Sequence, residues 1–71
     1  MNEINRDWFN RLIDEHNELE EKTNKLAEFL LSVAYNKLSK ANRILLKEQW
    51  KVMDTYKDVL KVRIELNKPN E

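Results

Sequence analysis

The sequence contains no glycine, no cysteine and a single proline, Pro69. Without glycine, the chain has no glycine-rich phosphate loop and lacks the residue that tight β-hairpin turns most often require. Without cysteine, it has no disulfide, no thiolate nucleophile and no cysteine-ligated zinc. In a chain of 71 residues, of which 41% are hydrophobic and 37% charged, these absences predict one all-α domain spanning residues 1–71.

Long apolar runs are also absent. No segment approaches the ~18 apolar residues of a membrane-spanning helix. The first residues, MNEINRDW, lack the apolar run of a secretory signal peptide. We therefore expect a soluble, intracellular protein that makes no contact with a membrane.

The formal net charge is zero, but the two halves of the chain differ in sign. Residues 1–34 contain four Lys/Arg and eight Asp/Glu, a balance of −4, whereas residues 35–71 contain nine and five, a balance of +4. Opposite charge favours antiparallel packing of the two halves, although exposed ion pairs contribute only ~0–1 kcal/mol each. The neutral total argues against a general nucleic-acid binder.

Apolar residues recur with helical spacing in the first half of the chain. Leu12, Leu19, Leu26 and Val33 are seven residues apart, which is the heptad spacing of packed helices. This repeat predicts a first helix from about residue 3 to about residue 35.

A polar break at about residues 36–39 separates the first helix from the second. Ser39 is the best N-cap for a helix from about residue 40 to about residue 67, and Pro69 stops that helix. The predicted architecture is therefore two long antiparallel helices, a helical hairpin.

The second helix carries two apolar columns, each with a spacing of seven. Both columns predict buried core. They consist of Leu45, Val52, Val59 and Leu66, and of Leu46, Met53 and Leu60.

This apolar face is wider than one partner helix can cover. A hairpin standing alone would expose a larger apolar patch than monomers normally do. We therefore expect a homo-oligomer, either a dimer forming a four-helix bundle or a tetramer of hairpins. The residues expected at the interface between subunits are Leu12, Leu19, Leu26, Trp50, Met53 and Leu60.

The sequence offers little for catalysis. The single histidine, His16, has Glu20 one turn away, and two ligands are too few for a metal site. Ser32 and Ser39 have no base nearby in the sequence. We expect no enzyme activity, no metal and no cofactor, with His16 as a polar residue of the helix seam.

A third column of the second helix, Gln49, Tyr56 and Arg63, is polar and lies beside the apolar face. One interpretation is that these residues fix the register of a bundle. The other is a ligand site, because a guanidinium near apolar surface needs an anionic or carbonyl partner. Arg63 with Tyr56 would then supply a phosphate fork and a stacking surface.

The second helix also has a basic face formed by Lys40, Arg43, Lys47 and Lys51. Such a face can contact phosphates. Glu48 lies close by, and the opposite half of the chain is acidic, so a solvated face that pairs with the first helix is the favoured interpretation.

The pattern RLIDEHNELEEKTNKLAEFL, followed by LLKEQWKVMDTYKDVLKVRIEL, resembles a widespread family of short phage proteins. The resemblance spans roughly residues 11 to 66. The matching residues are Arg11, Leu12, Glu15, Glu18, Leu19, Lys22, Lys25, Leu26, Phe29, Leu30, Leu45, Leu46, Gln49, Met53, Tyr56, Leu60, Arg63 and Ile64.

These short hairpin proteins are similar in architecture to phage anti-CBASS and anti-Thoeris sponges, which bind cyclic nucleotide immune signals without cleaving them. The resemblance implies a protein of the infected bacterial cytoplasm that sequesters a cyclic dinucleotide such as cGAMP. The alternatives are an inhibitor or adaptor that grips a host protein through an apolar helical surface, and a purely structural oligomer. The ligand-binding candidates are Trp8, Arg11, Lys22, Lys25, Gln49, Tyr56 and Arg63.

Overall fold

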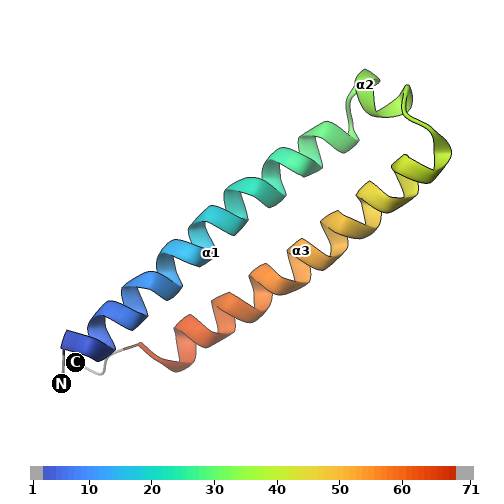
Figure 1. The fold of residues 1–71 in the computed structure, drawn as a ribbon. Helices are drawn as coiled ribbons and strands as arrows, with labels where there is room; N and C mark the ends of the chain where they lie inside the picture. The colour runs from blue at the N-terminus through green and yellow to red at the C-terminus, as the bar shows by residue number, and fades with distance from the viewer. Residues whose placement is uncertain (1–2, 69–71) are drawn as a thin grey trace.

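The computed structural model describes residues 3–68, and their side chains from Asp7 onward. Two long helices, α1 (Glu3–Leu30) and α3 (Lys40–Leu66), are joined through a short helix, α2 (Val33–Asn36). Figure 1 shows α1 and α3 running antiparallel side by side, with α2 at the turn. The molecule measures 52 × 18 × 14 Å. Residues 3–68 contain no strand, so the all-α helical hairpin is confirmed.

The first helix ends at Leu30, and the expected continuation to Tyr35 is wrong. The amide of Ser32 donates to the carbonyl of Phe29 at 2.9 Å, a tightened last turn. The Ser32 hydroxyl then accepts from the amide of Tyr35 at 3.1 Å and caps α2. A serine side chain that bonds nearby backbone competes with helix continuation, and here it restarts the helix in a new direction.

Tyr35 secures the turn between the long helices. The residue is 5% exposed, and its ring meets Phe29 edge-on, with ring centroids 6.2 Å apart. Its hydroxyl donates to the carbonyl of Arg43 at 2.9 Å. One side chain thus ties the end of α1 to the first turn of α3.

The second long helix begins where the sequence predicts. The Ser39 hydroxyl accepts from the amide of Asn42 at 3.2 Å, which satisfies one of the unpaired donors of the first turn. At the other end, α3 stops at Leu66, and the side-chain amide of Asn67 donates to the carbonyl of Arg63 at 2.7 Å.

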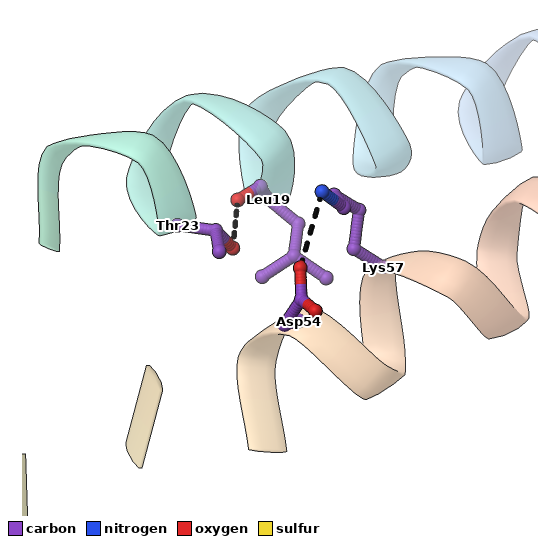
Figure 2. A network of polar contacts seen from close by, with 4 residues as sticks. All are labelled: Leu19, Thr23, Asp54 and Lys57. Atoms are coloured by element: carbon purple, nitrogen blue, oxygen red, sulfur yellow. Dashed lines mark hydrogen bonds and ion pairs between the residues drawn. The ribbon is translucent and has the colours of Figure 1, made fainter. Parts of the chain in front are cut away.

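The core is the seam between α1 and α3. Leu60 is fully buried, Leu12 is 4% exposed and Thr23 is 1% exposed. The Thr23 hydroxyl donates to the carbonyl of Leu19 at 2.7 Å, so its burial leaves no unpaired group. Figure 2 shows Leu19 and Thr23 on α1, facing a half-buried ion pair between Asp54 and Lys57 on α3 at 3.2 Å.

Only one of the two apolar columns of α3 faces this seam. Leu60 is buried, and Leu46 and Met53 are half-buried. The other column is exposed in the single chain, because a single neighbouring helix covers only one side of α3, and its burial stays a prediction about an assembly. Its exposed fractions are 65% for Leu45, 60% for Val52, 49% for Val59 and 78% for Leu66.

The residues expected between subunits build the hairpin itself. Leu12 and Leu60 are buried within the single chain, which leaves them little surface for a second one. The other members of the set are half-buried; they are Leu19, Leu26, Trp50 and Met53.

Among residues 3–68, no helix combines the length and the apolar character that crossing a membrane requires.

Candidate ligand-binding surface

The start of α1 and the end of α3 meet at the end of the hairpin remote from α2 (Figure 1). There the Arg63 guanidinium carbon lies 5.8 Å from the centroid of the Trp8 ring, a cation–π contact. Trp8 is 45% exposed, and such exposed contacts stabilise by ~0.5–1 kcal/mol. The contact therefore orients Arg63 and leaves much of the indole open to solvent.

A second contact across the seam joins Tyr56 to Glu15. The Tyr56 hydroxyl donates to a carboxylate oxygen of Glu15. This hydrogen bond, with burial and the negative charge of Glu15, raises the pKa of Tyr56 above its ordinary 10.0, and the positive charge of Arg63 acts in the opposite direction. Trp8, Glu15, Tyr56 and Arg63 thus form one group, which we name the Trp8–Arg63 cluster.

Arg63 is the cation of this cluster, and it has no ion-pair partner among residues 7–68. The ion pairs of the described side chains all join residues three or four apart on the chain, and none includes Arg63. Its planar guanidinium keeps N–H donors available for an anion, while Trp8 and Tyr56 offer aromatic faces beside it. The cluster can therefore bind a phosphate and stack a base at neighbouring points.

The other cations expected to bind a ligand divide into two kinds. Lys22 is exposed, lies seven residues after Glu15 on the same side of α1, and has no ion-pair partner in the part of the chain described. Arg11 instead pairs with Asp7 at 3.0 Å. Lys25 pairs with Glu21 at 3.7 Å, so both of these cations are engaged locally.

Gln49 lies apart from the cluster, two helical turns before Tyr56. Its side-chain amide donates weakly to the sulfur of Met53 at 3.9 Å. The structure therefore unites Trp8, Tyr56 and Arg63, and leaves Gln49 exposed further along α3.

A depression of about 410 Å³ lies outside this cluster, between α1 and the last turns of α3. His16 lines it, half-buried, with Nδ1 3.2 Å from the side-chain oxygen of Asn17, as expected for a polar seam residue. Lys57 and Lys61 face it together with Asp58. Within the described residues, no three side chains are grouped as metal ligands.

A smaller depression of about 290 Å³ lies at the turn and was not anticipated from sequence. Lys40, Arg43 and Lys47 line it beside Tyr35. None of these three cations takes part in an ion pair in the described region, so the basic face of α3 does not pair with α1. Because Tyr35, from outside α3, is part of its lining, spacing along α3 alone cannot reveal this hollow.

A comparison with protein-family models matches residues 6–66 to the family described as Sequestin. The match covers most of α1, the turn and all of α3. No curated protein and no solved structure matches the chain.

Proposed function

The chain belongs to the Sequestin family, and from this premise we propose that it sequesters a cyclic dinucleotide without cleaving it. The family name denotes a sequestering protein, which agrees with the phage-type hairpin resemblance in the sequence. The ligand class, the absence of cleavage and the immune pathway are parts of the proposal. A cGAMP-like signal of CBASS-type defence, captured in the cytoplasm of an infected bacterium, is the ligand we propose.

The observation that carries the proposal is the position of Arg63. Its guanidinium rests beside Trp8 and has no carboxylate partner among the described residues. A cyclic dinucleotide presents two phosphates and two bases. Charge-assisted bonds from Arg63 suit a phosphate, and Trp8 and Tyr56 suit a base, since base stacking on aromatic rings contributes ~1–3 kcal/mol.

Lys22 extends the same surface along α1. As an exposed ammonium two helical turns from Glu15, Lys22 lies about 20 Å along α1 from Trp8, so we propose that it attracts the anionic ligand and does not contact it together with Arg63. The negative charge of Glu15 lies between them, and we expect it to select a ligand that also presents hydrogen-bond donors, such as the amino groups of purine bases.

Calorimetry of the purified protein against a panel of cyclic di- and trinucleotides tests the proposal. We expect binding of a cyclic dinucleotide at a fixed fraction of a ligand per chain. Arg63→Ala should weaken it roughly ten- to hundredfold, as expected for one lost bond to a charged group. Lys51→Ala is the matched control, because it removes a positive charge from an exposed position of α3 outside the cluster and should leave binding unchanged.

A third variant separates charge from geometry. Arg63→Lys keeps the positive charge but loses the planar fork and the contact with Trp8, so we expect it to bind more weakly than the wild type and more strongly than Arg63→Ala. Equal binding by the wild type, Arg63→Lys and Arg63→Ala would contradict the role of Arg63. If Lys47→Ala alone abolished binding, the phosphate site would lie in the basic depression near Tyr35 instead.

The alternative function is an inhibitor that binds a host protein. The exposed apolar side chains of α3, with Leu66 78% and Leu45 65% exposed, are the observation that favours it. Absence of binding across the whole nucleotide panel, from a folded protein, would reject the cyclic-nucleotide proposal and leave this alternative.

A further inference from the structure

One face of α3 is apolar and uncovered from end to end. Its members are seven residues apart, and all are about half exposed or more. At 1.5 Å per residue the row is about 32 Å long. We name it the Leu45–Leu66 stripe; it consists of Leu45, Val52, Val59 and Leu66.

The hairpin also exposes more surface than a chain of its size normally does. Its accessible area is 5848 Å², whereas a compact monomer of 8.6 kDa exposes about 4,700 Å². The excess of about 1,100 Å² exceeds the roughly 800 Å² that each partner hides in a standard interface. A second copy that hides an ordinary share of this surface would remove most of the excess.

The order of residues in the stripe indicates what covers it. Leucine, valine, valine and leucine read the same from either end, at equal spacing. A two-fold axis near residues 55 and 56 would place Leu45 against Leu66 of the partner subunit. The same axis would place Val52 against Val59 of the partner subunit, so a second copy covers the whole stripe at once.

The polar column beside the stripe fits the same axis. Gln49, Tyr56 and Arg63 each follow a stripe residue by four positions, so they form its flank. In the antiparallel arrangement, Tyr56 meets its own copy near the axis. Arg63 and Gln49 of the partner subunit then lie at nearly the same level along the two helices. The dipoles of the two α3 helices are also opposed.

We propose that two copies of this chain form a two-fold antiparallel dimer through the Leu45–Leu66 stripe, giving the helix order α1–α3–α3–α1. The inference rests on the surface and its symmetry, and it does not depend on the proposed ligand. The Trp8–Arg63 cluster, which shares Tyr56 and Arg63 with this column, would then occur twice on one assembly.

Cysteine cross-linking tests the register, because the chain has no cysteine of its own. Val52→Cys and Val59→Cys are made as two variants with tags of different size. Oxidation of the mixture should give a disulfide between the two variants. Each variant oxidised alone should give little, since like positions lie about 10 Å apart along the antiparallel helices, beyond the ~7 Å limit between Cα atoms. Self-linking of Val52→Cys alone would show a parallel pairing and overturn the proposal.

Light scattering tests the dimer without cross-linking. We expect the wild type to have the mass of two chains, and Val52→Lys to have the mass of one with helical circular dichroism retained. Val33→Lys is the matched control, because Val33 is 71% exposed but lies on α2, and it should remain dimeric. A monomeric wild type, or an unchanged mass for Val52→Lys, would overturn the proposal.

Discussion

Tyr56 links the two long helices through a single acceptor, the carboxylate of Glu15. In the folded chain this contact holds the phenol in its neutral form and raises its pKa. Because the folded value lies above the unfolded value, the stabilising effect is fully present below pH 10.0. It is lost as the pH rises through the folded pKa.

Glu15→Gln should therefore lower the pKa of Tyr56 towards its ordinary 10.0, because the variant weakens the hydrogen bond that the phenol donates and also removes the negative charge of Glu15. The measurement is the ultraviolet absorbance of the phenolate against pH. Subtracting the titration of Tyr56→Phe isolates Tyr56 from Tyr35. An unchanged midpoint in Glu15→Gln would mean that the Glu15 contact does not control this ionisation.

The packing of the seam is concentrated in a few side chains, of which Leu60 is fully buried. Leu60→Ala should lower the free energy of unfolding by ~2–5 kcal/mol, because it leaves a cavity in the hairpin. Leu31→Ala is the control; this side chain is 89% exposed, and its truncation should cost less than ~0.5 kcal/mol. Urea unfolding followed by circular dichroism measures both, and equal losses would contradict the assignment of the seam.

At the scale of the helix, much of the hairpin could be predicted because its signals are local. The heptad spacing that includes Leu12 and Leu19 indicates the first long helix. The N-cap at Ser39 indicates where the second long helix begins. The early end of α1 could not be predicted from local signals, because there the Ser32 hydroxyl accepts a hydrogen bond from the amide of Tyr35. The ring of Tyr35 also packs against Phe29, and this contact is visible only in the folded chain.

The N-cap of α3 at Ser39 can be tested by substitution. Ser39→Ala should destabilise the protein by about 1 kcal/mol, because the amide of Asn42 loses its acceptor. Ser39→Asp should retain the stability of the wild type, since aspartate accepts the same bond and its charge favours a helix start. Thermal unfolding of the two variants compares them directly. A loss of similar size in Ser39→Asp would indicate that capping is not the cause.

At the scale of the whole molecule, the sequence showed an apolar face that one hairpin cannot bury, but not which column faces inward. Both columns of α3 have the same spacing and similar residues, and only the docking of α1 decides between Leu60 and Val59. The sequence could indicate which residues are candidates for the site, but not which of them lie together. The pairing of Arg63 with Trp8 needed the two ends of the hairpin to meet in space.

Association through the Leu45–Leu66 stripe couples folding to concentration. The unfolding temperature should rise with the protein concentration, as it does whenever folded chains bind each other and unfolded chains do not. Val52→Lys should remove this dependence, whereas Val33→Lys should keep it. Scanning calorimetry over about a hundredfold range of concentration provides the test, and a constant midpoint for the wild type would speak against the dimer.

Sequestration without cleavage is the central claim, and one time course tests it most directly. A cyclic dinucleotide that binds in calorimetry is incubated in excess over the protein, and the free and heat-released ligand are measured by mass spectrometry. We predict that the free ligand falls at once by a fixed amount per chain and then stays constant, and that the bound ligand is recovered intact after heating. A continuing decline with the appearance of linear product would show catalysis, and no decline at all would show that the ligand is not held.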